Sequence, residues 1–267
     1  MIAKPRPLYN LTGLFDKAIS MFAAASLPMY DWPEIRPFTD EFWAGFARHA
    51  GLSGVLDRRG SYSDLWRNPN LILGQTCGYP FTHEFKGILK AIATPHYAAN
   101  GCVGPRYSSV VFARQKCTLE DLRGARPAFN NPDSMSGMLA LKLVFADLNR
   151  SGEFFAPATI TGGHLDSLAA MQAKTVDVCA IDAVCVALAG KYRPHLLEGL
   201  HEIARSPLVP GLPFVTRAGD VEMLRRALRA TLEDKALKQA REGMLLCGQS
   251  ILTPAEYDII PQLEAAL

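Results

Sequence analysis

The sequence lacks the patterns that mark metal proteins, membrane proteins and nucleic-acid-binding proteins. Its six cysteines form no CxxC pair and stand in no His/Cys spacing typical of zinc, so we expect neither a metal site nor a cofactor. No stretch approaches the ~20 apolar residues of a membrane-spanning helix. There is no block of like charge, and a net charge of +2 is too small to predict nucleic-acid binding.

Strong signals for the cellular compartment are also scarce. The N-terminus has a basic start, but Asp16 and Lys17 interrupt any apolar core of a signal peptide, so none is predicted. Cysteines within apolar runs such as "VDVCAIDAVCVALAG" are typical of reduced, buried thiols, which mildly favours a reducing compartment. An even number of cysteines leaves disulfides open.

The composition is that of a soluble globular protein, and the pattern is that of an α/β fold. Hydrophobic residues make up 49% and charged residues 20% of the 267 residues. Short apolar runs alternate with longer amphipathic ones, which predicts strands alternating with helices and mixed, mainly parallel sheets. In such sheets ligands bind beyond the carboxyl ends of the strands, where helices begin.

Two strand-like segments divide the chain. "YSSVVFAR" (107–114) and "IARSPLVPGLPFV" (203–215) flank a self-contained block of about ninety residues, as a two-lobed clamp with a two-strand hinge requires. We therefore predict a first lobe from residues 20–112 and 205–267, an inserted second lobe at 113–204, and an N-terminal extension at 1–19.

The stretch "NPDSMSGMLALKLVFADLNR" (131–150) predicts a helix whose start could bind an anion. Apolar residues form one helical face: Met138, Leu141, Phe145 and Leu148. The first amides of a helix lack partners and carry partial positive charge, Ser134 and Ser136 add hydroxyl donors, and Gly137 permits close approach. The alternative is that Asp133 or Ser134 simply caps the helix.

Two further polar residues stand at predicted junctions of strand and helix. His164 follows two glycines in "TITGGHLDSLAAM" and could donate to an anion, or it could be a capping or surface residue. Asp182 ends the strand-like run "VDVCAID". It could cap the next helix or receive a cationic group of a ligand.

Together, "DLRGARPAFNNPDSMSGML", "TGGHLDSLAAMQAKTVDVCAID" and "IARSPLVPGLPFV" resemble the phosphate, phosphite and phosphonate substrate-binding proteins of ABC importers. The resemblance covers about residues 70–216 and implies the two-lobed type 2 periplasmic-binding-protein fold. The family's anion-holding Ser-Thr-Ser-Gly falls on the positions Ser134, Met135, Ser136 and Gly137. Its histidine and its strand-end aspartate fall on two further residues, His164 and Asp182.

Two departures from the family pattern bear on the ligand. Met135 replaces a hydroxyl residue, and Leu165 follows His164 where the family often has Glu. The family also implies that an acidic residue receives the amino group of an aminoalkylphosphonate, a role open to Asp182.

Four residues of the first lobe are expected to face the cleft because they follow predicted strands: Tyr30, Asp31, Thr76 and Tyr79. An aromatic ring there would pack on an organic group. The alternative for Tyr30 and Tyr79 is ordinary surface packing.

The resemblance implies a monomeric, periplasmic solute-binding protein that delivers a small oxyanion ligand to an ABC permease. The absent leader signal keeps alternatives open: a cytosolic enzyme on the same fold, of the menaquinone-precursor or thiamine-pyrimidine type, or a cytosolic ligand-sensing module. No nucleophile–base pair is evident in the sequence, since nothing pairs His164 or Asp182 with an activated Ser or Cys.

Overall fold

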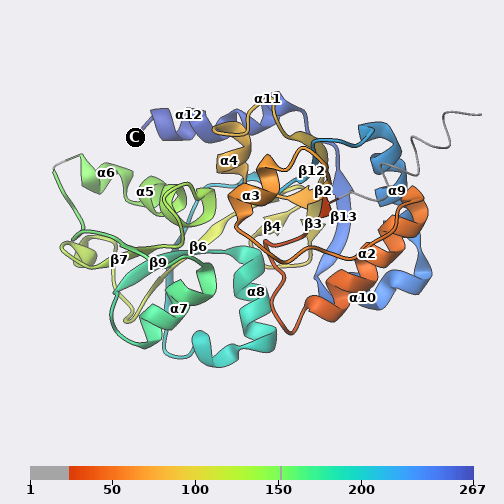
Figure 1. Ribbon diagram of the computed structural model, residues 1–267. Coiled ribbons are helices and arrows are strands. Elements are labelled where there is room, and N and C mark those ends of the chain that lie inside the picture. Colours follow the sequence, from red (N-terminus) through yellow and green to blue (C-terminus); the bar gives the residue numbers. More distant parts are fainter. Residues whose placement is uncertain (1–23, 151) are drawn as a thin grey trace, which may run out of the picture.

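The computed structural model describes residues 24–150 and 152–267 and has two lobes, each built on a five-stranded sheet with helices packed against it (Figure 1). The predicted extension 1–19 lies outside the described residues. The predicted α/β class with mixed sheets is confirmed.

The first sheet has the order β1-β2-β12-β3-β13, formed by β1 (Ala24–Ala25), β2 (Leu71–Gln75), β12 (Phe214–Thr216), β3 (Lys90–Tyr97) and β13 (Leu246–Ser250). Strands β1, β2 and β3 run one way, while β12 and β13 run the other. The helices of this lobe are α2 (Arg36–Ala50), α3 (Tyr62–Arg67), α4 (Gly78–Thr82), α9 (Val221–Glu233), α10 (Lys238–Gly243), α11 (Pro254–Tyr257) and α12 (Ile259–Ala265). Helix α2 packs against α9 and α10 (Figure 1).

The second sheet has the order β10-β6-β9-β7-β8, formed by β10 (His201–Arg205), β6 (Ser109–Ala113), β9 (Val178–Asp182), β7 (Pro127–Phe129) and β8 (Thr159–Ile160). Here β6 runs opposite to the other four strands. The sheets are mixed as predicted, but they are not mainly parallel. In the first sheet only β1 and β2 are parallel neighbours, and in the second β7 is parallel to β8 and β9, while the other neighbouring strands are antiparallel. The helices are α5 (Ala140–Val144), α6 (Ala146–Asn149), α7 (His164–Gln172) and α8 (Ala183–Tyr192).

Two chain segments cross between the lobes side by side. Before the crossing, β5 (Arg106–Tyr107) pairs with β4 (Cys102–Val103) and with β11 (Val209–Pro210), which follows the return. Ser109 and Ser206 join the segments, since Ser109 N–H donates to Ser206 Oγ (2.8 Å) and Ser206 N–H donates to Ser109 O (2.9 Å). Because β6 is a strand of the second sheet, we propose the hinge at residues 108–109 and 205–206, slightly before the predicted boundary at 112–113.

The strands β6 and β9 of the second sheet are buried on both faces, and this fixes which residues reach the site. Along β6, Val110 and Phe112 belong to the large core shared with the first lobe, whereas Val111 and Ala113 pack on the outer side with Phe145. This alternation is the period of two that a strand imposes. Consequently the carboxyl ends of β7 and β9 are held rigidly at the edge that faces the first lobe.

An ion pair links the lobes at the periphery. Arg193 follows α8 in the second lobe, and its guanidinium donates to both carboxylate oxygens of Glu34 in the first lobe, at 2.9 and 3.2 Å. The same guanidinium lies 5.9 Å from the centre of the Trp32 ring. The side chains are 28% and 33% exposed, so the pair is partly screened by solvent.

We expect the substitution Arg193→Gln to weaken the closed arrangement by about 1 kcal/mol, or roughly fivefold in the ratio of closed to open molecules, because the ion pair spans the lobes. Small-angle X-ray scattering should report a larger radius of gyration than for the unchanged protein. Arg48→Gln is the matched control, because the Arg48–Asp234 pair (2.8 Å) lies within the first lobe. Equal radii for both variants would show that the Arg193 pair does not hold the lobes together.

Candidate functional site

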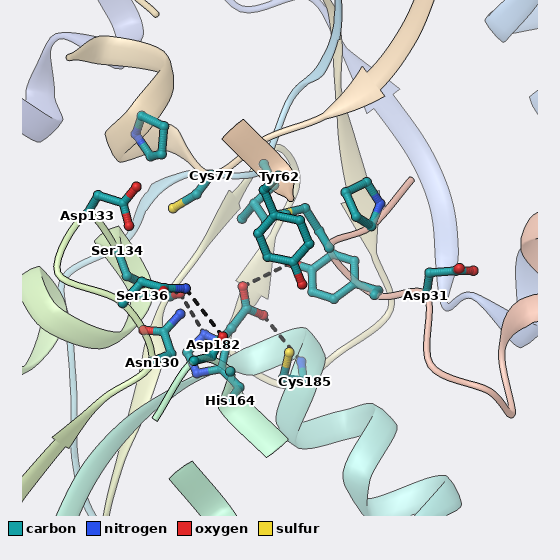
Figure 2. Close-up of a pocket in the computed structure, with 18 of the residues that line it drawn as sticks. Asp31, Tyr62, Cys77, Asn130, Asp133, Ser134, Ser136, His164, Asp182 and Cys185 are labelled. Atoms are coloured by element: carbon teal, nitrogen blue, oxygen red, sulfur yellow. Dashed lines mark hydrogen bonds between the residues drawn. The ribbon is translucent and has the colours of Figure 1, made fainter. Parts of the chain in front are cut away.

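A cleft of about 490 Å³ lies between the lobes. The first lobe contributes residues 28–33, residues 61–63 and 66 at α3, and Cys77, Pro80 and Glu84 around α4. The second lobe contributes residues 130–136 except Pro132 and Met135, together with the first turns of α7 and α8. Figure 2 shows the side chains from both lobes converging on one space, with Ser134, Ser136 and His164 at one end and Asp31 at the other.

Ser134 and Ser136 have different roles at the first helix start. Ser134 caps the π-helical turn Met135–Leu139, because its Oγ accepts from Gly137 N–H at 3.0 Å. Ser136 Oγ instead lies 2.8 Å from His164 Nε2 and 3.4 Å from Ser134 Oγ. The capping alternative is therefore realised by Ser134, while Ser136 directs its hydroxyl toward the histidine in the cleft (Figure 2).

His164 is the first residue of α7, and the start of this helix is open. The preceding residue is Gly163, and no side chain among the described residues caps it. Burial lowers the pKa of His164 to about 4, so the imidazole is neutral at physiological pH. Its Nδ1 is buried and has no hydrogen-bond partner among the described residues. The uncapped amides and this nitrogen are polar groups that a ligand could satisfy.

Asp182 ends β9 and joins the lobes at the floor of the cleft. Its Oδ1 accepts from the N–H groups of Val184 (2.6 Å) and Cys185 (3.3 Å), and thus caps α8. Its Oδ2 accepts from the Tyr30 hydroxyl of the opposite lobe at 2.9 Å. Burial raises the pKa of Asp182 to about 6, although these three hydrogen bonds favour the carboxylate and oppose that rise. Asp182 is therefore both a helix cap and a carboxylate on the cleft.

The structure corrects the prediction for Thr76 and Tyr79, which do not line the cleft. Thr76 is fully buried. Tyr79 turns toward the C-terminal helix, where its hydroxyl donates to Glu264 Oε1 at 2.7 Å and its ring stacks on His83 at 3.9 Å. Cys77, the N-cap of α4, is the residue after β2 that reaches the cleft, and Tyr79 lies within the helix.

Met135 and Gly137 also lie outside the cleft lining. The Met135 side chain is fully buried in the core, and its N–H donates to Cys77 Sγ at 3.4 Å. A Cβ at Gly137 would overlap with Oδ1 of Asn130. Glycine is therefore required there by a neighbouring side chain of the protein, whereas the sequence suggested close approach by a ligand.

Tyr30 and Asp31 line the cleft as predicted, but they are not equally available. Tyr30 is engaged by Asp182, and burial raises its pKa well above the ordinary value. Asp31 accepts from Arg58 through both carboxylate oxygens and also from Thr39. Its charge is therefore already neutralised within the first lobe.

Several cleft residues were not predicted from the sequence, among them Trp32, Tyr62, Cys77, Asn130 and Asp166. One usable signal was the capping box in "SYSD", in which Ser61 and Asp64 bond each other's backbone and start α3 at Tyr62. Another was the pair of asparagines immediately before the Ser134 motif.

The cleft has an unbalanced charge. Among the described residues that line it none is a lysine or arginine, and the only histidine is His164. The carboxylates that line it are Asp31, Glu84, Asp133, Asp166 and Asp182. No group of three or more His, Cys, Asp or Glu side chains in the described part of the chain is arranged to hold a metal ion. A simple anion would therefore find hydrogen-bond donors but no cationic side chain.

Two lobes joined by paired crossing segments, with a cleft between them, have the architecture of a two-lobed clamp. Residues 71–246 match the family described as "ABC transporter, phosphonate, periplasmic substrate-binding protein". This match spans more than half of the chain, and the chain therefore belongs to that family. The resemblance inferred from the motifs is confirmed, and with it a solute-binding role.

Solved structures share the fold at low sequence identity. PhnD1 from Prochlorococcus marinus, in complex with methylphosphonate, has a TM-score of 0.73 at 16% identity, covering 91% of this chain and 97% of that one. A binding-protein component of an ABC phosphonate transporter from Pseudomonas aeruginosa has a TM-score of 0.74 at 16% identity, covering 91% of this chain and 85% of that one. XAC2383 from Xanthomonas citri, bound to ATP, has a TM-score of 0.62 at 18% identity, covering 91% of this chain and 95% of that one.

A comparison with curated protein sequences gives no match. The family is periplasmic and implies a small solute and a membrane permease as partners. Within the described residues, no helix is both long enough and apolar enough to cross a bilayer.

The raised pKa of Asp182 predicts a specific pH dependence of stability. An unfolded aspartate titrates near ~3.9, so between about pH 4 and 6 the folded state holds a proton that the unfolded state has lost. The unfolding free energy should thus fall as pH rises through this window, by on the order of 3 kcal/mol, and stay level above it.

Chemical denaturation from pH 4 to 7 measures this slope. Asp182→Asn should remove this fall of the unfolding free energy with pH. Tyr30→Phe should extend the fall above pH 6, because the Tyr30 hydrogen bond lowers the Asp182 pKa. A slope identical in all three proteins would rule out the buried, proton-binding carboxylate.

Proposed function

We propose that the cleft binds a zwitterionic organophosphonate, with the phosphonate at the Ser136–His164 end and an ammonium group at Asp182. The observation that carries this proposal is the combination of neutral donors with carboxylates in a cleft that has no lysine or arginine among its described lining residues. In a zwitterionic ligand the anionic group would meet the neutral donors and the cationic group would meet the carboxylates.

The anion end supplies donors in either tautomer of His164. If Nε2 accepts the Ser136 proton, Nδ1–H is the free donor. If Nε2–H donates to Ser136, the Ser136 hydroxyl proton can go to a ligand oxygen in place of its long 3.4 Å contact with Ser134 Oγ. The open first turn of α7 adds backbone N–H groups and the positive end of the helix dipole. Hydrogen bonds to an oxyanion are stronger than those between neutral groups.

The cation end follows from the position of Asp182. Its carboxylate is buried and satisfied by O–H and N–H donors, and no cationic side chain among the described residues contacts it. An ammonium group of the ligand would supply the missing positive charge and stabilise the ionised form.

We further propose that the protein transports its ligand without converting it. The structure does pair Ser136 with His164, which the sequence did not indicate, so the expectation of no such pair needs correction. However, Nδ1 of His164 has no orienting carboxylate among the described residues, and a pKa of about 4 makes the imidazole a weak base. Burial also raises the pKa of both cleft thiols, Cys77 and Cys185, which keeps them protonated.

The family is periplasmic, and we propose that this chain acts there as a monomer whose closed form is recognised by the permease. All six cysteines are free thiols in the structure. Secretion of a reporter fused to the complete sequence would test export.

Isothermal titration with phosphate, methylphosphonate and 2-aminoethylphosphonate tests the ligand class. We expect 2-aminoethylphosphonate to bind at least about tenfold more tightly than methylphosphonate, since its ammonium meets a desolvated carboxylate. Asp182→Asn should abolish that preference. Equal affinities in the unchanged protein would contradict the zwitterion proposal, and ³¹P NMR signals of new products after long incubation would contradict the absence of chemistry.

A matched pair of serine variants separates binding from capping. Ser136→Ala should weaken phosphonate binding by ~1–3 kcal/mol, because it removes a charge-assisted donor or leaves His164 without its partner. Ser134→Ala should instead cost about 1 kcal/mol of folding stability as a lost helix cap. Titration calorimetry and thermal unfolding of both variants measure the two effects. A Ser136 variant with unchanged affinity would show that this hydroxyl takes no part in binding.

A further inference from the structure

The cleft is larger than a phosphonate with a short amino-alkyl chain requires. Its volume is about 490 Å³. Clefts of roughly 300–1,000 Å³ typically enclose drug-sized molecules. The groups assigned above to the phosphonate and the ammonium, Ser136, His164 and Asp182, all belong to the second lobe. The wall of the first lobe is therefore left without an assigned part of the ligand.

That wall is aromatic. Tyr62, the first residue of α3, lines the cleft and remains 44% exposed, which is unusual for a large side chain between two lobes. Its ring lies 6.1 Å from that of buried Trp66. Burial, Cys185 and Asp166 all raise the pKa of Tyr62. The latter two residues lie in the first turns of α8 and α7, so Tyr62 faces the helix starts of the opposite lobe.

Trp32 forms a second part of the same wall and is held in place. It lines the cleft with Pro28, Met29 and Pro33, and the Arg193 guanidinium lies 5.9 Å from its ring centre. Arg193 is itself fixed by two hydrogen bonds to Glu34. A held indole and an exposed phenol on the same wall of the cleft provide a preorganised apolar surface, which costs little entropy to occupy.

Tyr62 and the Ser136–His164 pair line the same cleft (Figure 2), and Asp166, which acts on Tyr62, lies in the same first turn of α7 as His164. A ligand whose phosphonate bonds Ser136 and His164 would thus extend its substituent across the cleft toward Tyr62.

We propose that the cleft selects phosphonates whose substituent carries a flat apolar group, such as an aromatic ring, and that Tyr62 and Trp32 form the subsite for it. This inference rests on the proposed phosphonate-binding function and adds the size and character of the substituent. Planar apolar groups gain both area burial and ring–ring contact in such a subsite.

The test compares methylphosphonate with phenylphosphonate, which carry the same charged group and differ only in the substituent. By titration calorimetry the full chain should bind phenylphosphonate at least about tenfold more tightly. In the variant Tyr62→Ala this ratio of dissociation constants should fall toward one, and Trp32→Leu should reduce it. Tyr62→Phe keeps the ring and should keep the ratio. Because each ratio is measured within one variant, any unfolded fraction cancels.

Each other outcome overturns the inference in a distinguishable way. Equal affinity for the two ligands in the unchanged protein would refute the aromatic subsite while leaving phosphonate binding intact. A preference for phenylphosphonate that survives Tyr62→Ala and Trp32→Leu would refute the assignment of these residues. If neither ligand nor 2-aminoethylphosphonate binds, the proposed function fails as well.

Discussion

The hydrogen-bonded carboxylate of Asp182 is the interaction on which the rest of the site depends. It ends β9, caps α8 through two backbone N–H groups, and accepts from Tyr30 of the opposite lobe. A buried carboxylate is costly unless its lone pairs are satisfied. Here two donors belong to its own lobe, and the third, the Tyr30 hydroxyl, is supplied only when the lobes are together. Closure of the lobes and the charge of the cleft floor are therefore coupled through one side chain. A ligand that brings a cation to this carboxylate would favour the closed form.

The three helix starts that the second lobe presents to the cleft differ in what satisfies their first backbone N–H groups. The protein caps the first with Ser134 and α8 with Asp182, while α7 begins after Gly163 without a side-chain cap. An anion is therefore expected at the start of α7, next to the Ser136–His164 pair. The other two starts are already capped by the protein. Neutral donors at this position, with carboxylates elsewhere on the lining, distinguish the cleft from one that binds an anion through arginine or lysine.

The sequence predicted strands well where apolar runs were strong, as in β6 and β9. It located His164 and Asp182 at the cleft because carboxyl ends of strands and helix starts meet at one edge of a sheet. It did not place Thr76 and Tyr79, because α4 begins at Gly78 and carries Tyr79 toward Glu264, whereas Cys77 just before it lines the cleft. Helix α3 and the edge strand β13 were missed, since "YSDLWR" and "LCGQS" carry little apolar periodicity. The Ser136–His164 contact could not be predicted either, because it joins residues 28 positions apart through tertiary packing alone.

Closure over a ligand, the open start of α7 and the buried carboxylate together describe a clamp for a molecule that carries both charges. The most direct measurement is a crystal structure of the protein grown with 2-aminoethylphosphonate. The clamp predicts phosphonate oxygens within hydrogen-bond distance of Ser136 or His164 and of the first amides of α7, with the ammonium nitrogen against Asp182. A phosphonate bound elsewhere in the cleft, or in the reverse orientation with its oxygens toward Asp182, would contradict it.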